Sequence, residues 1–415
     1  MRDDPFFSIV LATYGRGRHI APTIESVLRQ TFSRFELIVA GDGCGDETEA
    51  TVGSFNSDRV SWRNLAQNCG SQSFPNNEGI RCARGPWICY IGHDDVWSSD
   101  HLAEMYRLAA GEGTADFAVS GCIFHGPPGS GTDRATGIFG DERAPFMHFY
   151  PPSSFAHRRD VVSRIGGWRD PGSIAAPVDY DFLQRAKRAG MRFAFTGRVT
   201  VHKFAAAQRY LSYLRQTDDE QRAALRAFDA GGETSPSATA HLKRTGGFLT
   251  LRCLYFSRFK RGQIFGRNRA HRGLKLPPLR PLKQRAVVEQ SDDPRGFDWH
   301  RLERGGLRWS GPNPRPRILI PFTGERAQID IEVGGLAPGA ATEGLAVAVE
   351  EQKVDHALEC DQAGTQWLRF VAPLRRDDYT VATLHTPVMV SRRKLLGRCR
   401  RVGLAAGKIV LDPLA

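Results

Sequence analysis

Residues 35–43 read FELIVAGDG, an apolar run closed by an aspartate between two glycines. An apolar run bounded by a turn signal is typical of a buried strand. A similar run, FSIVLA, lies at 7–12, and another, WICYI, at 87–91. Apolar residues recur at helical spacing over 20–28 and 76–83. Strands that alternate with helices predict an α/β fold, with a mainly parallel sheet and helices on both faces.

The rest of the first half is less regular. We expect a strand at 60–63 and helices that begin after the N-caps Asp46 and Ser99. Residues 121–160 are rich in Gly, Pro and Ser and predict an active-site loop or an irregular insert. Further expected elements are a helix over 179–188, short strands near Phe193 and Val199, and a helix from Gln208 to Phe228.

The pattern changes after Gly305. Apolar runs that suggest strands, separated by Gly and Pro turns, occur at 317–320, 328–333, 345–349, 367–371 and 408–411. Regular short strands with turns predict an all-β sandwich. We therefore expect a first domain over 1–235, a basic helical segment with a Pro-rich linker over 236–290, and the sandwich over 291–415. The sandwich is expected to be structural or oligomerising, with glycan binding as the alternative.

Positive charge is concentrated in one segment. The chain has a net charge of +12, and residues 241–285 hold thirteen Lys or Arg and no acid. The remainder balances 44 basic against 45 acidic residues. The segment also has an aromatic stripe at helical spacing from Phe248 to Phe259. It favours either a solvated face or peripheral contact with an anionic membrane. Nucleic acid is not the expected partner, because no recognisable binding module accompanies the charge.

Localisation signals are scarce. No apolar run is long enough to span a membrane, and the acidic start of the chain does not resemble a signal peptide. The eight cysteines form no Cys-x-x-Cys pair, which argues against a zinc ribbon or a disulfide framework. We expect free thiols and a cytoplasmic protein, either dissolved or peripheral at the inner face of the membrane.

Polar side chains follow three of the predicted strands. Thr13 follows the first, Asp42 the second, and Asp94 and Asp95 the third. Ligands of open parallel sheets sit beyond the carboxyl ends of the strands. Several carboxylates in one pocket need a compensating positive charge. Mg²⁺ or Mn²⁺ would provide it and would also bind a substrate's phosphates.

Six stretches, in this order and spacing, resemble the family 2 glycosyltransferases of the GT-A fold. The resemblance extends over the first 205 residues or so, about half the chain, and the stretches that carry it are 8–14, 37–48, 76–80, 90–97, 166–169 and 179–182. The resemblance implies an inverting, metal-dependent hexosyltransferase. Its donor is a nucleotide-diphosphate sugar, and its acceptor is a hydroxyl of a glycan or of a lipid-linked molecule.

The resemblance also assigns roles to residues. Asp42 corresponds to the carboxylate that reads the nucleobase, and Asp94 to the metal-binding aspartate, with Asp95 and His202 as further candidate metal ligands. The implied donor-binding residues are Thr13, Tyr14, Arg16, Asp42, Asn76, Gly79, His93 and Asp94. Asp179, or alternatively Asp181, corresponds to the general base, and Trp168 to a wall of the acceptor site. Lys203, Phe204 and the segment from Gln208 are expected to clamp the diphosphate.

The sequence departs from the family pattern at several positions. Gly41 stands where the family often has an acid, and Gly92 replaces the first aspartate of the Asp-x-Asp motif. Gly15 and Val178 replace a common asparagine and a common acid. These losses support an alternative, a glycan-binding protein with a degenerate, non-catalytic transferase domain. Nucleotidyl transfer is disfavoured because no Lys-bearing, Gly-rich phosphate loop follows the first strand.

Overall fold

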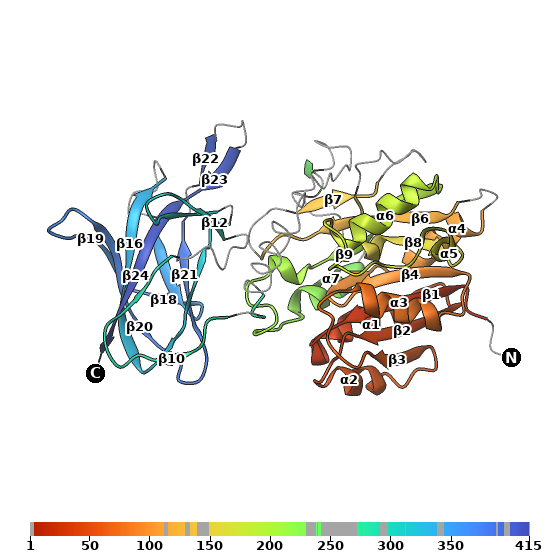
Figure 1. Cartoon of the computed structure of the whole chain (residues 1–415), viewed down its shortest axis with the longest axis horizontal. Helices are drawn as coiled ribbons and strands as arrows, with labels where there is room; N and C mark the ends of the chain where they lie inside the picture. The colour runs from red at the N-terminus through yellow and green to blue at the C-terminus, as the bar shows by residue number, and fades with distance from the viewer. Residues whose placement is uncertain are drawn as a thin grey trace. The chain divides into compact units, whose positions relative to one another are not determined.

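The structure, a computed structural model, describes residues 4–111, 115–128, 133–138, 149–229, 238, 240–241, 272–274, 276–290, 298–311, 313–337, 344–386, 389–393 and 399–414. The chain divides into two compact units (Figure 1). The first comprises residues 1–206 and 215–264, and the second comprises 207–214 and 265–415. No helix among the described residues is long and apolar enough to cross a membrane.

A nine-stranded sheet forms the centre of the first unit. Its neighbours run in the order β3-β2-β1-β4-β8-β6-β9-β5, and β7 pairs with β6. Pairing is parallel from β3 to β4 and between β6 and β9, whereas β5, β7 and β8 are antiparallel to their neighbours. The strands are β1 (Phe7–Thr13), β2 (Phe35–Gly41), β3 (Val60–Asn64), β4 (Trp87–Gly92), β5 (Asp95–Trp97), β6 (Phe117–Phe124), β7 (Arg134–Thr136), β8 (Phe155–Arg158) and β9 (Phe193–Lys203).

Helices cover both faces of this sheet, which confirms the predicted α/β class. Successive side chains of a strand point to opposite faces. On one face Ile9 and Leu11 of β1 share a core with α1 and α4, and on the other Val10 shares a core with α5 and α6. The helices are α1 (Ala21–Leu28), α2 (Thr48–Ser54), α3 (Ser73–Cys82), α4 (His101–Ala109), α5 (Val161–Ile165), α6 (Val178–Arg188) and α7 (Asp219–Asp229).

Some local predictions were wrong. Strands β6 and β8 lie wholly or partly in the segment expected to be an irregular loop or insert. In β6 the strand pattern is interrupted at Gly121, where a Cβ atom would meet Ile138 at 2.7 Å. The two short strands expected near Phe193 and Val199 are one strand, β9. The helix predicted from Gln208 begins only at Asp219.

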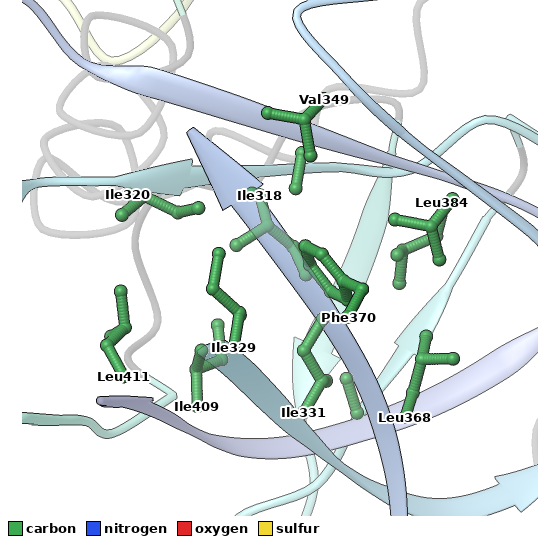
Figure 2. Close-up of a cluster of buried hydrophobic side chains, with 14 of the residues drawn as sticks. Ile318, Ile320, Ile329, Ile331, Val349, Leu368, Phe370, Leu384, Ile409 and Leu411 are labelled. Atoms are coloured by element: carbon green, nitrogen blue, oxygen red, sulfur yellow. The ribbon is translucent and has the colours of Figure 1, made fainter. Parts of the chain in front are cut away.

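The second unit is a β-sandwich, as predicted. A seven-stranded sheet runs in the order β12-β13-β24-β16-β20-β19, with β11 on β24, and a four-stranded sheet in the order β14-β21-β17-β18. The alternating side chains of β16, such as Ile329 and Ile331, pack with Ile318 and Leu384 of the opposite sheet (Figure 2). The strands are β11 (Ala286–Val288), β12 (Trp299–Leu302), β13 (Arg308–Ser310), β14 (Arg317–Ile320), β16 (Arg326–Leu336), β17 (Ala346–Val349), β18 (Gln352–Val354), β19 (His356–Cys360), β20 (Gln366–Pro373), β21 (Thr380–His385) and β24 (Leu404–Leu414).

Two short sheets complete the second unit. One pairs β10 (Arg280–Pro281) with β15 (Phe322–Thr323), and the other pairs β22 (Val390–Arg393) with β23 (Cys399–Val402). The pairings of β10 and β11 place residues 280–281 and 286–288 in the β unit. Residues 242–271 lie outside the described residues, and with them most of the basic segment and its predicted helix. Membrane contact through 241–285 stays a prediction, as do the domain boundaries at 235 and 290.

Candidate active site

The carboxyl ends of β1, β2 and β4 meet at one edge of the sheet. The parallel register pairs Thr13 with Gly41 and Ala12 with Gly92. The turn after β2, which holds Asp42, and the turn after β4, which holds Asp94, therefore flank the end of β1. The sequence predicted this meeting of strand ends, and the two turns differ in what their carboxylates contact.

The Asp42 carboxylate accepts hydrogen bonds from the neighbouring loop of residues 68–70. Its Oδ1 accepts a hydrogen bond from the Cys69 amide at 2.9 Å, and its Oδ2 accepts one from the Gly70 amide at 2.9 Å and one from Asn68 Nδ2 at 3.0 Å. Asp42 is 4% exposed. At the adjacent Gly43, where φ is +68°, a Cβ atom would lie 2.4 Å from the Asn68 amide. Asp42 thus holds the 68–70 loop, and its predicted contact with a nucleobase stays a prediction.

Asp94 is held from two sides and keeps one oxygen available. Its Oδ2 accepts a hydrogen bond from the Ala206 amide at 2.5 Å, and its carbonyl oxygen accepts one from Gln221 Nε2 at 3.2 Å. No described residue donates a hydrogen bond to Oδ1. Burial alone would raise the pKa of Asp94, but Lys203, His93 and Arg16 outweigh it and lower the pKa to about 2. Asp94 is therefore ionised at neutral pH.

Asp95 forms an internal ion pair. Its Oδ2 accepts hydrogen bonds from Lys203 Nζ at 2.7 Å and from Ser153 Oγ at 2.5 Å. The Ser153 hydroxyl in turn accepts the Gly92 amide at 3.0 Å. Burial opposes the charge of Lys203, but Asp95 and Asp94 outweigh that penalty and raise its pKa above the ordinary value. The ammonium of Lys203 is consequently a permanent positive charge beside two carboxylates.

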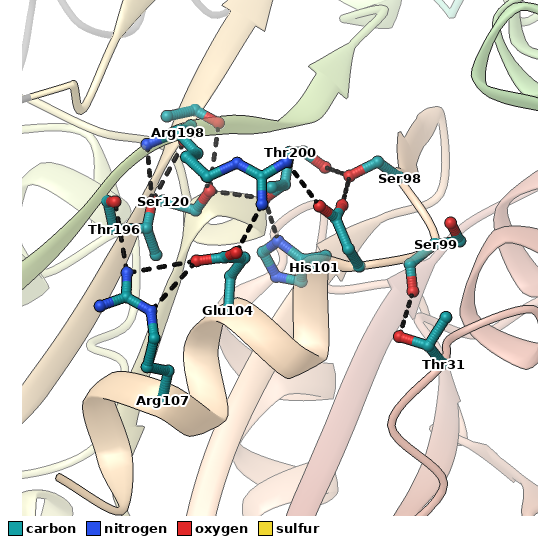
Figure 3. A network of polar contacts seen from close by, with 12 residues as sticks. Thr31, Ser98, Ser99, His101, Glu104, Arg107, Ser120, Thr196, Arg198 and Thr200 are labelled. Carbon is teal, nitrogen blue, oxygen red and sulfur yellow. Dashed lines mark hydrogen bonds and ion pairs between the residues drawn. The ribbon is translucent and has the colours of Figure 1, made fainter. Parts of the chain in front are cut away.

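A polar network fixes the strand that carries Lys203. His101 Nδ1 lies 2.6 Å from Thr200 Oγ1, and this hydroxyl lies 2.5 Å from Ser120 Oγ (Figure 3). Arg198 of the same strand pairs with Glu104 of α4 at 2.5 Å. Burial lowers the pKa of His101 to about 3, so its ring is neutral in this network. These contacts join β6, β9 and α4 and hold Lys203 opposite Asp95.

His202 does not join the acidic cluster. In β9 it precedes Lys203, and successive strand residues point to opposite faces. His202 Nδ1 instead lies 2.9 Å from His125 Nε2, and burial lowers its pKa to about 3. The three predicted metal ligands Asp94, Asp95 and His202 are therefore not brought together. Within the ranges that the structure describes, no group of three or more His, Cys, Asp or Glu side chains could hold a metal ion.

The residues nevertheless fit a divalent cation of a particular kind. Mg²⁺ is commonly bound through one or two carboxylates, with substrate phosphates and water as its other ligands. Asp94 Oδ1 offers one such oxygen, whereas Asp95 is already neutralised by Lys203. The site thus fits an ion that arrives with a diphosphate, and it does not fit an ion held by protein ligands alone.

The structure separates the two candidate bases. Asp181 Oδ2 pairs with Arg185 Nε at 2.8 Å, and Arg185 also donates to the carbonyl oxygens of Gly166 and Gly167. Asp179 is half-buried, and its Oδ1 accepts the Tyr180 amide at 2.8 Å. No described residue donates to its Oδ2. Burial raises the pKa of Asp179, against the lowering effect of nearby Lys203. Asp179 therefore keeps an oxygen that no described residue binds, whereas Asp181 binds the arginine that contacts the backbone of Gly166 and Gly167.

Two other predicted site residues belong to the core. Trp168 is 3% exposed, its ring stacks on Phe182 with centroids 4.8 Å apart, and Tyr90 packs against its edge. The structure thus places Trp168 in the core, and its predicted contact with the acceptor stays a prediction. Gly79 was predicted to bind the donor, but it packs on β1, where a Cβ atom would lie 2.3 Å from Val10 Cγ1. Its role is to let α3 approach the sheet.

The remaining predicted donor residues lie at or beside the strand ends. Thr13 and Asn76 are buried, and Thr13 Oγ1 and Asn76 Nδ2 have no hydrogen-bond partner among the described residues. Such orphaned polar atoms are unusual in a protein interior and often mark a functional site. Arg16 is buried close enough to Asp94 to lower its pKa, as is the half-buried His93. Tyr14 is half-buried.

Sequence reasoning missed two members of the site, Ser153 and Gln221. Ser153 holds Asp95, and Gln221 of α7 holds the Asp94 backbone. A lone serine in a Pro- and Ser-rich stretch gives no signal by itself. Gln221 lies in a helix distant in sequence from β4. Only the folded chain brings these residues together.

Two cavities lie near the strand ends. One of about 350 Å³ borders the 68–70 loop and is lined by Leu65, Phe74 and Cys69, among others. The other, of about 580 Å³, is polar and borders the segment after β1, with Arg18, His19 and Arg222 in its walls. Neither is lined by Asp94, Asp95 or Asp179.

Known sequences agree with this geometry. A family model described as glycosyl transferase family 2 matches residues 8–165. The match spans β1 to α5 and includes both aspartate turns. This part of the chain is therefore similar to glycosyl transferase family 2.

Individual relatives are distant. The chain is 30% identical over 100 residues to the Escherichia coli UDP-Glc:alpha-D-GlcNAc-diphosphoundecaprenol beta-1,3-glucosyltransferase WfgD, covering 24% of this chain and 39% of that protein. It is 27% identical over 136 residues to the Staphylococcus aureus poly(ribitol-phosphate) beta-N-acetylglucosaminyltransferase TarP, covering 32% of this chain and 40% of that one. The chain thus spans between about a third and a half of the length of the curated relatives that it matches.

Among solved structures, S. aureus TarS 1-349 in complex with UDP-GlcNAc aligns with a TM-score of 0.42 at 15% identity. The alignment covers 62% of this chain and 75% of that one.

Proposed function

We propose that this chain is an inverting glycosyltransferase. It would move a hexose from a nucleotide-diphosphate sugar to a hydroxyl of a glycan or lipid-linked acceptor. One observation carries the proposal: ionised Asp94 after β4 and Asp179 of α6, whose pKa is raised, both lie close enough to Lys203 for its charge to lower their pKa values. Cations stabilise a leaving diphosphate, and a carboxylate with a raised pKa is suited to general base catalysis.

The proposed reaction is a single displacement. Asp179 Oδ2 takes the proton of the acceptor hydroxyl, and the hydroxyl oxygen attacks the anomeric carbon on the face opposite the diphosphate. The bond between the anomeric carbon and the diphosphate oxygen breaks, and its electron pair leaves with the nucleoside diphosphate. Lys203 and Arg16 stabilise the negative charge that develops there. Attack from the opposite face inverts the anomeric configuration.

A divalent cation would be held at Asp94 Oδ1, the oxygen that no described residue occupies. Mg²⁺ or Mn²⁺ bound there would act as a Lewis acid on the diphosphate oxygens. Asp94 is the one residue of the predicted metal set that we keep for this role. The nucleobase would be bound near the turn that holds Asp42, the residue to which the resemblance assigns this role.

The alternative of a degenerate, non-catalytic domain has less support. Its main argument is the loss of the acid at Gly92. A carboxylate nevertheless fills that place in space, because a Cβ atom at Gly92 would lie 2.8 Å from Asp95 Oδ2. The base candidate Asp179 and the metal candidate Asp94 are both present. The site therefore keeps three carboxylates, those of Asp94, Asp95 and Asp179, although residue 92 is a glycine.

The test is release of nucleoside diphosphate from UDP-, GDP- and dTDP-hexoses with Mn²⁺, with water as the acceptor. We expect turnover of at least one donor and, in Asp94→Ala, a loss of about 1,000-fold, since several kcal/mol of charge stabilisation disappear. Retained folding of the variant is checked by circular dichroism. Absence of turnover with every donor, or equal turnover by Asp94→Ala, would contradict the proposal.

A further inference from the structure

In the turn after β4, a carboxylate lies against the position of Gly92. A Cβ atom at Gly92 would lie 2.8 Å from Asp95 Oδ2 and 3.3 Å from Asp94 Oδ1. A side chain at residue 92 would therefore displace the Asp95 carboxylate. The space that an acid at position 92 would enter is occupied by an acid that belongs to position 95.

The Asp95 carboxylate is bound by other side chains of the protein. Asp95 is fully buried, and its Oδ2 is bound by Lys203 and Ser153. Its charge is balanced within the protein, which is the condition for a buried carboxylate to persist. A cation from solution is not needed to neutralise it. The negative charge of Asp95 is therefore paired with the positive charge of Lys203.

The Lys203 ammonium has hydrogen-bond donors that no described residue accepts. An ammonium has three N–H donors. Among the described residues Asp95 is the one acceptor within hydrogen-bond distance of Lys203 Nζ. The Lys203 side chain is 19% exposed, whereas that of Asp95 is 0% exposed. The ammonium thus keeps hydrogen-bond donors that no described residue accepts, on a side chain that is not fully buried.

We propose that Lys203 is a resident cation that binds the donor's diphosphate directly, so that the nucleotide binds without a divalent metal ion. This inference rests on the proposed transferase function and adds the means of binding. Asp94 is then the carboxylate that remains for a metal ion. The metal would stabilise the diphosphate as it leaves and would contribute less to nucleotide binding. A phosphate oxygen would complete the ammonium's hydrogen bonds, while Asp95 keeps the ammonium in place.

The experiment is calorimetric titration of the full chain with UDP and with GDP, each in Mn²⁺ and in EDTA. We expect the wild type to bind one of them in EDTA within about tenfold of its affinity in Mn²⁺. Lys203→Met should weaken the binding in EDTA by about 10- to 100-fold, the worth of a charge-assisted hydrogen bond. Lys203→Arg should restore most of it.

Two further variants keep the test decisive. Lys203→Met leaves Asp95 buried without its partner, and this variant is at risk of unfolding. The double variant Asp95→Asn/Lys203→Met removes both charges, and it should fold and show the same loss in EDTA. Lys353→Met, an exposed lysine of β18, is the charge-matched control and should bind like the wild type.

The outcomes separate the two proposals. Binding by the wild type only in Mn²⁺ overturns the role of Lys203 and leaves the transferase function standing. Unchanged binding in EDTA by the folded double variant also overturns it. No binding of either nucleotide in either condition overturns the transferase function and this inference together.

Discussion

The turns after β2 and β4 lie on either side of the end of β1, at one edge of the sheet, but their aspartates have different contacts. Asp42 gives its carboxylate oxygens to three donors of the 68–70 loop. Asp94 keeps one oxygen without a described donor and lies near Lys203, Arg16 and His93. A carboxylate whose hydrogen bonds are internal stabilises structure first. One that is ionised and incompletely bound is prepared for a ligand.

The same contrast recurs on α6. Asp181 is bound by Arg185, whereas Asp179 has an oxygen without a described donor. The contrast predicts which substitutions reduce turnover and which reduce stability. The following predictions test it, beginning with the largest effect.

Asp179→Asn should reduce kcat for donor turnover by about 100- to 10,000-fold, the usual worth of a general base. Asp181→Asn on the same helix should reduce kcat by less than about tenfold, because Asp181 acts by positioning Arg185. Steady-state kinetics at saturating donor measure both. Equal losses in the two variants would contradict the assignment of roles.

The next largest expected effect is a fall in kcat at acidic pH. A general base must be ionised, and burial raises the pKa of Asp179 above the ordinary 3.8. The rate should therefore fall about tenfold per pH unit as the pH drops below that raised pKa, so the acid limb lies above pH 3.8. In Asp179→Asn this limb should disappear. A limb that persists in the variant would assign it to another group.

The Asp42 turn should show its effect in stability. In Asp42→Asn the amide group would face a backbone N–H of the 68–70 loop, which costs about 1–3 kcal/mol for the unsatisfied donor. Urea unfolding followed by circular dichroism measures the loss. The exposed Asp355, changed to Asn, is the control and should stay within about 0.5 kcal/mol of the wild type. An unchanged midpoint for Asp42→Asn would show that the loop does not depend on this carboxylate.

The smallest expected effect comes from comparing alanine substitutions at two glycines, one near each aspartate turn. A Cβ atom at Gly92 meets the Asp95 carboxylate, whereas at Gly45, beyond the Asp42 turn, it meets nothing within 4 Å. Gly92→Ala should push Asp95 away from Lys203 and weaken nucleotide binding several-fold, while Gly45→Ala should leave it unchanged. Titration with UDP and GDP measures both. Wild-type affinity in Gly92→Ala would show that the Asp95 position does not matter for binding.

Much of the fold follows from patterns in the sequence. Buried runs such as 35–40 and the strict alternation at 328–333 predict their strands, because periodicity depends on burial alone. β6 was missed because Gly121 weakens its pattern, and the reason for that glycine is its contact with Ile138 and β9. The helix predicted from Gln208 shows the opposite error, a helix start that is placed too early. Helical spacing of apolar residues does not reveal where the chain turns before the helix begins.

The candidate site was only partly predictable. The strand ends identified Asp42, Asp94 and Asp95, but which carboxylates are already bound depends on residues far away in sequence. Lys203 lies 108 positions from Asp95, and Ser153 lies 58 positions away. His202 was predicted to lie on the side of the acidic cluster, but in a strand only one of the neighbours His202 and Lys203 can face Asp95, and that residue is Lys203. The core position of Trp168 could not be predicted because a core tryptophan and a ligand-binding one look alike in a sequence.

The most direct test of the central claim is thermal unfolding of the wild type with UDP-, GDP- and dTDP-sugars in the presence of Mn²⁺. A ligand at about 100 times its Kd stabilises a protein by about 2.7 kcal/mol, which corresponds to a rise in Tm of roughly 5 to 10 °C for a domain of this size. The account predicts such a rise for the sugars of one nucleotide and none for Mn²⁺ alone. A Tm that no nucleotide-sugar raises above the value in Mn²⁺ would contradict it.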